Sequence, residues 1–376
     1  MLQQSTYREG KTELVVPPSS LTSEVPPRDP AFFNPLGMLK RDVMVALVAG
    51  YARGIASKIS FGDPLAGVGA GAIRVCKEAT VKRVYVNDLN PDAIELARTS
   101  ARLNGIYRKC SFSRMEATDF LSKHSGPRKR LDWVELDPFG SPSAFFEPAI
   151  RACKIGGIVS ATATDGSVLC GIYPKVCFRK YGSYSLNTEY CHEIALRILY
   201  GGLAFAGMRL DLGIEPVFVH TTKHYSRAYA KVTSKAVPTS SQIGYIVHCF
   251  SCNTRFTSGE IETRCKDCGK KTRIAGPLWT GNLFDRKIIH DAINNAPSKT
   301  SLEMLEAAMA ETGAPPTYYV IDKLCDLLGI APPSLSKVTG ELRRRGHEAV
   351  RTILNPKAVR TDADIRIIKE VVRSLG

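Results

Sequence analysis

Three consecutive residues at the end of an apolar run, Asp137, Pro138 and Phe139, have side chains suited to proton transfer and base stacking. Residues 131–136 indicate a buried parallel strand, and open α/β sheets bind ligands at the carboxyl ends of such strands. Asp137 could accept a hydrogen bond from an exocyclic amine and take up its proton, and the Pro138 carbonyl could accept a second one. Phe139 would hold a base in line with a methyl donor. The pattern predicts methylation of a nucleobase amine, with an ordinary Asp-Pro turn as the alternative.

A glycine-rich turn, residues 63–74, lies earlier in the chain between a predicted strand and a predicted helix. Gly67 and Gly69 allow the backbone to approach a ligand closely. Asp88 ends the next predicted strand, where a carboxylate suits the two hydroxyl groups of a ribose. Because Ala72 takes the third position of the glycine pattern, the turn fits either a nicotinamide dinucleotide or S-adenosylmethionine.

Glu116 and Ala117 extend this nucleoside pattern, because they follow a third predicted strand. In nucleoside-binding sheets this position lies beside the adenine, where a carboxylate or a backbone group can contact the base edge. The same residues also fit the ordinary start of a capped helix, with Thr118 or Glu116 near its N-terminus. Both interpretations stay open at this point.

The elements that would position these residues alternate between strand and helix patterns. Such alternation is typical of a doubly wound α/β fold with a parallel, Rossmann-like sheet. The predicted strands are residues 58–61, 83–87, 131–136 and 158–162, with a later pair at 215–220 and 228–233. The predicted helices are residues 42–54, 73–78 and 91–104. Composition predicts an extended segment at 1–40 with one strand at 12–16, a catalytic domain at 41–235 and a smaller C-terminal α+β domain at 236–376.

The overall charge of the chain indicates what kind of molecule it binds. The chain has 376 residues, with 51 Lys and Arg against 36 Asp and Glu, a net charge of +15. A strongly basic protein usually binds a polyanion, which favours a nucleic acid. No uncharged apolar run approaches the ~20 residues of a spanning helix, and the N-terminus lacks a signal-peptide core. We therefore expect a cytoplasmic protein that does not bind membranes, and nothing indicates an obligate protein partner.

Four of the eleven cysteines form a metal-binding pattern: Cys249-x2-Cys252, twelve residues, then Cys265-x2-Cys268. Two such pairs at this spacing predict one tetrahedral Zn²⁺ held by four thiolates, a closed site with a structural role in a zinc ribbon. Four reduced thiols or a redox pair are the alternative. The other seven are separated in the sequence, and we expect small buried apolar residues in a reducing compartment. These seven are Cys76, Cys110, Cys153, Cys170, Cys177, Cys191 and Cys325.

The C-terminal region resembles a winged helix, with a helix over residues 318–328, a turn over 329–333 and a second helix over 334–345. The second helix ends in Arg343, Arg344 and Arg345. Three consecutive arginines cannot all face a core, so we expect them on the surface, in contact with RNA phosphates. A solvated helix end, favoured by the helix dipole, is the alternative.

The sequence Asp-Pro-Phe-Gly-Ser-Pro at residues 137–142 resembles the signature of the tRNA guanine-N2 dimethyltransferases. These enzymes modify guanine 26, between the D stem and the anticodon stem of tRNA. Other segments resemble the family in the same order along nearly the whole chain. They are residues 6–17, 32–42, 86–105, 180–197, 224–232, 276–283 and 343–364, together with the four clustered cysteines. The resemblance implies a class I methyltransferase that uses S-adenosylmethionine in its catalytic domain, binds tRNA with its C-terminal domain and forms N2,N2-dimethylguanosine.

The resemblance also implies roles for residues at matching positions. Arg41 would contact the methionyl carboxylate of the cofactor, and Asp88 would hold its ribose. Asp137 would be the catalytic carboxylate. Phe139 would stack on the target guanine, with Phe32 on the opposite side of the base.

Two positions depart from the family pattern. Many members have an Arg inside the glycine-rich loop where this chain has Gly71, so Arg74 is the remaining loop arginine expected at the cofactor. The contact that the missing Arg would make is left open. Ile353 stands where the family more often has His.

Other functions compete with this interpretation. A methyltransferase could act on an amino group of another RNA or of DNA. A nicotinamide-dependent oxidoreductase could use the same sheet, but it would have no use for the Asp-Pro-Phe sequence at a strand end. A non-catalytic nucleic-acid-binding protein could use the zinc ribbon and the helical end, but it would leave Asp88, Asp137 and Phe139 without a role.

Overall fold

The computed structural model describes residues 3–55, 59–222 and 224–376, which form two compact units. Unit 1 comprises Met1–Thr162, Tyr229–Thr233 and Asp285–Glu306, and unit 2 comprises Ala163–Ala228, Ser234–Phe284 and Ala307–Gly376. The predicted division at residues 40 and 235 stays a prediction about folding domains, because each unit is built from several chain segments. Lys58, the first residue of one predicted strand, lies outside the described residues.

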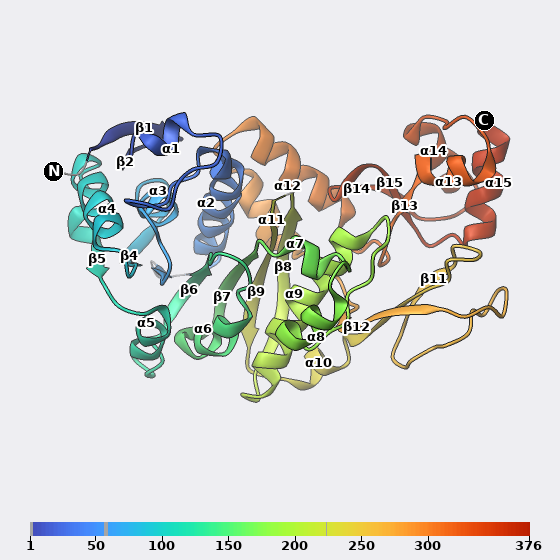
Figure 1. The fold of residues 1–376 in the computed structure, drawn as a ribbon, viewed down its shortest axis with the longest axis horizontal. Helices are drawn as coiled ribbons and strands as arrows, with labels where there is room; N and C mark the ends of the chain where they lie inside the picture. Colours follow the sequence, from blue (N-terminus) through green and yellow to red (C-terminus); the bar gives the residue numbers. More distant parts are fainter. Residues whose placement is uncertain (1–2, 56–58, 223) are drawn as a thin grey trace. The chain divides into compact units, whose positions relative to one another are not determined.

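Within the described residues, seven strands form one sheet in the order β5-β4-β3-β6-β7-β9-β8 (Figure 1). The strands from β5 to β7 pair in parallel. The chain order reverses between β3 and β6, and ligands bind open α/β sheets at the carboxyl ends beside such a reversal. The predicted Rossmann-like sheet is confirmed. Its strands are β3 (Ile59–Asp63), β4 (Val81–Asn87), β5 (Cys110–Ser113), β6 (Leu131–Leu136), β7 (Cys153–Ala163), β8 (Gly213–Thr221) and β9 (Ser226–Thr233).

Helices cover the part of this sheet that lies in unit 1, where α5 packs against α6 and α2 packs against both α3 and α11. An antiparallel hairpin, β1 (Ser5–Glu9) and β2 (Thr12–Val16), packs on α3 and α4. The short elements are α1 (Ser19–Thr22), η1 (Pro35–Gly37), η2 (Tyr107–Lys109) and η3 (Ser143–Phe145). The longer helices are α2 (Met38–Arg53), α3 (Ala70–Glu78), α4 (Pro91–Leu103), α5 (Ala117–Lys123), α6 (Phe146–Ala152) and α11 (Arg286–Ile293).

Local sequence explains several of these elements. All six residues of β6 are buried, as expected for a central parallel strand. Asn90 caps α4 by accepting hydrogen bonds from the backbone N–H groups of Asp92 and Ala93, and Pro91 supplies the first helical residue. A Cβ atom at Gly50 of α2 would lie 2.7 Å from the backbone nitrogen of Ala292, so only glycine permits the close packing of α2 on α11.

Unit 2 is organised around a long helix and two three-stranded sheets. The helix α9 (Cys191–Met208) is buried along most of its length and packs on β8 and β12. One sheet has the order β11-β10-β12 and carries the cysteine pattern, and the other has the order β13-β15-β14. Their strands are β10 (Ile243–His248), β11 (Arg255–Ser258), β12 (Arg273–Trp279), β13 (Tyr319–Val320), β14 (Ala349–Thr352) and β15 (Asn355–Thr361). Unit 2 also contains α7 (Gly166–Leu169), α8 (Pro174–Tyr181) and α10 (Val237–Ser240), the last residues of α12 (Lys299–Glu311), and the three C-terminal helices described below.

The C-terminal segment has the predicted winged-helix-like arrangement. Two helices, α13 (Ile321–Leu328) and α14 (Leu335–Arg344), precede the hairpin of β14 and β15, and α15 (Ile365–Leu375) ends the chain (Figure 1). Their apolar faces enclose one buried cluster that draws residues from each of these elements. No helix among the described residues is both long and apolar enough to cross a bilayer.

Unit 2 also buries four charged side chains, which we call the inner ion cluster: Glu193, Arg197, Glu311 and Arg360. Arg197 Nε lies 2.8 Å from Glu193, and Arg360 Nη1 lies 2.9 Å from the same carboxylate. Arg360 also pairs with Glu311 through its Nε. Glu311 accepts two further hydrogen bonds, from the Thr352 hydroxyl at 2.7 Å and from a backbone amide. The cluster joins α9, α12 and β15 through charges that neutralise one another.

Candidate active site and zinc ribbon

The glycine-rich turn after β3 is built around two residues with left-handed backbone conformations. Gly67 has φ 53° and Gly69 has φ 74°, which favour glycine. The backbone nitrogen of Gly67 donates a hydrogen bond of 2.7 Å to Asp88 at the end of β4. Asp88 also accepts a hydrogen bond of 2.9 Å from the backbone of Asn90. The structure therefore brings the predicted turn and the predicted ribose-binding acid together.

Several carboxylates lie near this turn at the carboxyl ends of β3 and β6. Asp63 is fully buried, which raises its pKa well above the usual value, and the charges of Glu135, Asp137 and Asp88 act in the same direction. Its carboxylate accepts a hydrogen bond of 3.2 Å from the backbone of Leu65. This concentration of negative charge suits a cationic ligand more than a dinucleotide, whose pyrophosphate is anionic.

Asp137 directly follows β6, as predicted, and its carboxylate forms an ion pair with Lys40 of α2. The Asp137 side chain is 32% exposed and the Lys40 side chain 17%. The Asp137 carboxylate is therefore accessible from solvent, and its ion pair with Lys40 fixes its orientation. The sequence analysis did not identify Lys40, although it directly precedes Arg41, which the family resemblance places at the cofactor.

The two predicted stacking residues are in contact. The ring centroids of Phe32 and Phe139 lie 4.9 Å apart, with the ring planes at 80°. The guanidinium of Arg28 lies 4.4 Å from the Phe139 centroid, on its face. Phe139 is nevertheless 56% exposed. Aromatic surface therefore lies immediately after Asp137 in the chain, and Arg28 is a neighbour that sequence analysis did not identify.

Arg41 and Arg74 belong to a second group of buried charges, which we call the site-side ion cluster: Glu9, Arg41, Asp42, Arg74 and Glu78. Arg41 donates two hydrogen bonds to Glu9, at 2.7 and 2.6 Å, and one to the Asn34 carbonyl. Arg74 is fully buried and contacts Glu9 at 2.8 Å, Asp42 at 2.6 Å and Glu78 at 2.9 Å. Their predicted contacts with the cofactor stay predictions.

The electrostatics of Glu9 follow from these partners. Burial by itself would raise the pKa of Glu9, but the hydrogen bonds and positive charges of Arg41 and Arg74 outweigh burial and hold that pKa below its usual value. Glu9 is therefore ionised at neutral pH and fixes both guanidinium groups. Its position in the hairpin gave no sequence signal for this role.

Glu116 and Ala117 lie at the start of α5, immediately after the region of β5. Ala117 is buried, whereas Glu116 is exposed and makes no side-chain capping hydrogen bond. The structure thus supports the helix start, but without a capping function for Glu116. Gly71 lies against Met44, whose terminal methyl would be 2.9 Å from an added Cβ.

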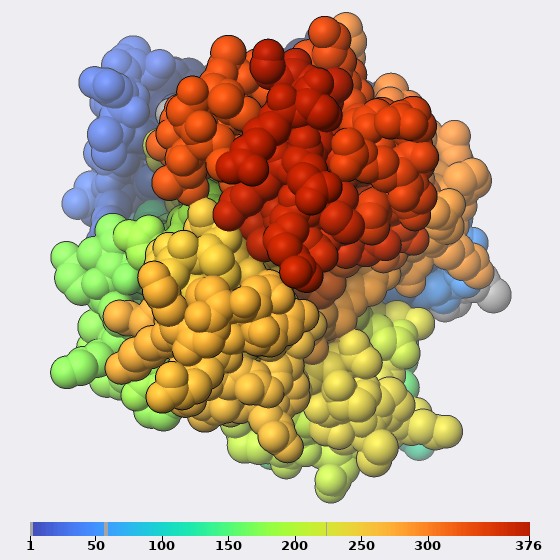
Figure 2. Space-filling model, turned by 90° about the vertical axis from the view of Figure 1, so that its right-hand side faces the viewer, coloured from blue at the N-terminus to red at the C-terminus, as the bar shows by residue number. Residues whose placement is uncertain are grey.

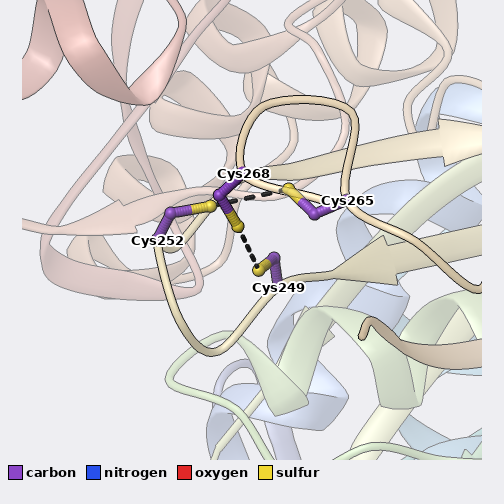
Figure 3. Close-up of side chains that lie close together, drawn as sticks. All are labelled: Cys249, Cys252, Cys265 and Cys268. Atoms are coloured by element: carbon purple, nitrogen blue, oxygen red, sulfur yellow. Dashed lines mark hydrogen bonds between the residues drawn. The ribbon is translucent and has the colours of Figure 1, made fainter. Parts of the chain in front are cut away.

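The four cysteines of the predicted zinc ribbon converge, as Figure 3 shows. Their sulfur atoms all lie within 4.8 Å of one another, with 3.5 Å between Cys249 and Cys268 and between Cys252 and Cys265. Four convergent thiols match the closed donor set of structural zinc sites. The residues present therefore fit a single Zn²⁺.

A second convergence was not predicted, because Cys170 lies 21 residues before the adjacent pair Cys191 and His192 and the spacing matches no common metal-binding pattern. Cys170 and Cys191 lie with His192 so that their donor atoms are all within 4.8 Å of one another. The Cys170 sulfur is 3.8 Å from His192 Nδ1. Burial lowers the pKa of His192, so its imidazole is neutral at pH 7. Cys76 and Cys110 are also neighbours, with their sulfur atoms 3.8 Å apart.

Arg343, Arg344 and Arg345 lie on the surface at the end of α14, as expected. Arg344 and Arg345 both pair with Glu341, at 2.6 and 2.8 Å, and lower the pKa of that carboxyl to about 2. Arg343 donates to the Ala349 carbonyl at 2.8 Å. Their contact with RNA stays a prediction.

Comparisons with known proteins identify the family of the chain. Residues 10–373 match the family model described as N2,N2-dimethylguanosine tRNA methyltransferase. A tRNA (guanine(26)-N(2))-dimethyltransferase of Methanothermobacter thermautotrophicus is 35% identical, over 98% of this chain and 99% of the relative, and that of Methanobrevibacter smithii is 32% identical over 99% and 97%. The structure of Trm1 from Pyrococcus horikoshii with S-adenosyl-L-methionine superposes with a TM-score of 0.85, at 28% identity, covering 98% of this chain and 99% of that one. This chain belongs to the N2,N2-dimethylguanosine tRNA methyltransferase family.

Proposed function

We propose that this protein methylates the exocyclic N2 of guanine 26 in tRNA twice, forming N2,N2-dimethylguanosine, with S-adenosylmethionine as the methyl donor. Family membership supports the reaction, and the names of the curated relatives support the target base. The observation that carries the proposal is the placement of Asp137 and Phe139 after β6, at the strand ends that also present Asp88 and the glycine-rich turn.

The carboxyl ends of β3, β4 and β6 supply the cofactor site in this proposal. Gly67 and Gly69 admit the cofactor against the backbone, and Asp88 binds the ribose hydroxyls. S-adenosylmethionine supplies a methyl group on a positively charged sulfur. That positive charge would favour the ionised form of Asp63, whose pKa is raised by burial, and would be attracted by the neighbouring carboxylate of Asp137.

The other residues predicted at the cofactor would contact its adenine and its methionyl carboxylate. Glu116 and the backbone at Ala117 would contact the adenine. Arg41 would bind the methionyl carboxylate, while Glu9 holds its Nε and Nη2. Arg74 acts one step further away, because it holds Glu9 and Asp42 in place.

Asp137 performs the proton chemistry. The lone pair of a guanine N2 is delocalised into the ring, so the amine needs an acceptor that favours its pyramidal form and takes up its proton. Asp137 has that function, with the Pro138 carbonyl as a second acceptor. Lys40 fixes the orientation of the carboxylate in the free protein.

The base must leave its stack to reach Asp137. Phe139 stacks on the extruded guanine and Phe32 supports it from the neighbouring position, so the contact between the two rings opens or shifts when the base enters. Arg343, Arg344 and Arg345 contact phosphates and position the tRNA.

The deciding experiment is single-turnover methylation of unmodified tRNA by Asp137→Asn, with calorimetry of S-adenosylmethionine binding. Asn keeps the shape but cannot take up a proton, so we expect about a 10³-fold slower reaction with cofactor affinity retained. The matched control is Asp92→Asn, an exposed aspartate of α4, which should react at the parent rate. Full activity of Asp137→Asn would refute the mechanism.

Product identity needs its own measurement. Mass spectrometry of nucleosides from treated tRNA should reveal N2,N2-dimethylguanosine, and a tRNA with adenine at position 26 should remain unmodified. Methylation of that variant, or of another amino group, would redirect the proposal to a different target. Calorimetry with NAD should detect no binding, and binding would favour the oxidoreductase alternative.

We also propose that the four ribbon cysteines hold one structural Zn²⁺. Metal analysis should find one equivalent of zinc, which Cys265→Ser loses together with part of the resistance to unfolding. Cys153→Ser, a buried cysteine of β7, should keep the metal. Equal zinc content in both variants would place the metal elsewhere.

A further inference from the structure

One face of unit 2 exposes several aromatic side chains that the proposed chemistry does not use. We call Tyr173, Phe178, Tyr184 and Phe250 the aromatic ledge; each is between 45% and 55% exposed. The rings of Phe178 and Tyr184 stack in parallel, with centroids 4.6 Å apart and planes at 16°. In Figure 2 the segment around α8 (green) lies beside the ribbon that carries Phe250 (yellow-orange).

Two residues of the aromatic ledge line a hollow. A cavity of about 360 Å³ is lined by Tyr184 and Phe250 together with Pro174, Asn187 and Arg273. This volume is within the range of small-ligand pockets. The ledge therefore offers both flat aromatic faces and a recess beside them.

Two residues of the ledge are anchored to neighbouring parts of unit 2. The backbone of Tyr184 exchanges two hydrogen bonds of 2.9 Å with Gly276 at β12. Phe250 packs edge-on against His248, at 4.3 Å between centroids, and His248 is itself held by the Tyr190 hydroxyl at 2.9 Å. These contacts restrain the positions of Tyr184 and Phe250, which lowers the entropy cost of binding a partner on them.

Positive charge accompanies the rings. Lys175, Arg179 and Lys180 lie on α8, all exposed, and Arg273 borders the cavity. Lys180 pairs with Asp165 at 3.1 Å. Neither Lys175 nor Arg179 has an ion-pair partner within residues 3–55, 59–222 and 224–376. Exposed rings interleaved with unpaired cations favour a polyanion with aromatic groups over an apolar protein surface.

We propose that the aromatic ledge is a second RNA contact, distinct from the site at Asp137. Phe178, Tyr184 and Phe250 stack on unpaired bases of the substrate tRNA, and Lys175, Arg179 and Arg273 contact its phosphates. Sequence-tolerant stacking on aromatic side chains combined with basic residues is how proteins hold single-stranded RNA segments. The proposal deepens the proposed function, since it takes tRNA as the ligand.

The experiment measures tRNA affinity over a range of salt concentrations for two variants of the full chain. In Phe178→Ala with Tyr184→Ala, loss of stacking should raise Kd about 10- to 100-fold. In Arg179→Gln with Arg273→Gln, the slope of log affinity against log salt should fall in magnitude by about 1.5, because two phosphate contacts are removed. The matched control is Tyr107→Ala, an exposed tyrosine stacked on Phe112 in unit 1, which should bind as the parent does.

The readouts separate this proposal from the proposed function. At saturating tRNA both ledge variants should methylate within twofold of the parent rate, and S-adenosylmethionine binding should be unchanged. Unaltered Kd and salt slope in both variants would overturn the ledge while leaving methylation intact, and a slower saturated rate at unchanged Kd would also overturn it. Failure of the parent protein to methylate tRNA would instead overturn the proposed function. The arginine substitutions are at exposed positions, so they test the ledge even if the aromatic double variant unfolds.

Discussion

The two buried ion clusters differ in their balance of charge and in the exposure of their side chains. The inner ion cluster of unit 2 has two carboxylates and two guanidinium groups, and each of its side chains is at most 2% exposed. The site-side ion cluster of unit 1 has three carboxylates for two guanidinium groups. It reaches the surface at Arg41, which is 10% exposed and directly follows Lys40, the partner of Asp137.

This difference indicates two uses of buried charge. An ion pair in a core is expensive to desolvate, and its main measurable effect appears when one partner is removed. The inner ion cluster joins elements far apart in the chain and ends within the core. The site-side ion cluster joins the hairpin, α2 and α3, and its Arg41 directly follows Lys40, the ion-pair partner of Asp137. We therefore expect changes in the first to affect stability alone, and changes in the second to affect stability and cofactor binding together.

The largest effect should come from Arg360→Met. Its loss leaves Glu193 and Glu311 buried with an uncompensated negative charge, so the free energy of unfolding should fall by about 3–5 kcal/mol. Urea unfolding measures this change, and S-adenosylmethionine affinity of the folded fraction should be unchanged. Arg366→Met removes an arginine that is 74% exposed and should have no measurable effect. A comparably small loss for Arg360→Met would show that the inner ion cluster is not a stabilising element.

Glu9→Gln should have the next largest effect on stability and, unlike Arg360→Met, should also impair the site. Gln keeps the shape of Glu9, but Arg41 and Arg74 lose a charged acceptor, which should lower the free energy of unfolding by about 2–3 kcal/mol. S-adenosylmethionine binding should weaken about tenfold, because Arg41 is no longer held in one orientation. Calorimetry and urea unfolding check the two results. Glu13→Gln, in the same hairpin but exposed, is the control.

Sequence patterns predicted the parts of the molecule that are locally encoded. β2 and β6 have the predicted bounds, because each is a short stretch rich in large apolar residues that ends just before a proline or an Asp-Pro turn. The glycine-rich turn, Asp88 and Asp137 follow β3, β4 and β6 as predicted, and they meet because the carboxyl ends of parallel strands share one edge. The four ribbon cysteines were predictable because zinc requires a particular spacing.

Contacts between distant segments could not be predicted in this way. Glu9 meets Arg74 across 65 residues, and Lys40 meets Asp137 across 97. No local pattern selects one carboxylate among many for a given arginine. The predicted helix at 318–328 instead begins at Ile321, because Tyr319 and Val320 pair with β15 as a short strand. Tertiary pairing overrode local periodicity there.

Asp63→Asn should stabilise unit 1 in a pH-dependent way. The pKa of Asp63 is raised in the folded state, so folding favours its protonated form; that contribution is fully present below the unfolded pKa and is lost as pH rises through the folded pKa. At pH 8 the uncharged Asn should therefore raise the free energy of unfolding by about 1–2 kcal/mol. Urea unfolding at pH 8 and pH 5 should show the gain shrinking at the lower pH. A pH-independent gain would contradict the explanation, and weaker cofactor binding would indicate that the negative charge serves the site.

The smallest effects test the comparison most directly, because each ion cluster has a threonine bonded to one of its carboxylates. Thr12 donates to Glu78 at 2.8 Å, and Thr352 donates to Glu311 at 2.7 Å. Thr12→Val should lower the free energy of unfolding by about 1 kcal/mol and Thr352→Val by about 2 kcal/mol. The second loss should be larger because Glu311 is completely enclosed, whereas Glu78 is 5% exposed and water can replace part of the lost bond. Urea unfolding measures both isosteric variants. Equal losses of free energy of unfolding would mean that water reaches the carboxylates of the two clusters to the same degree.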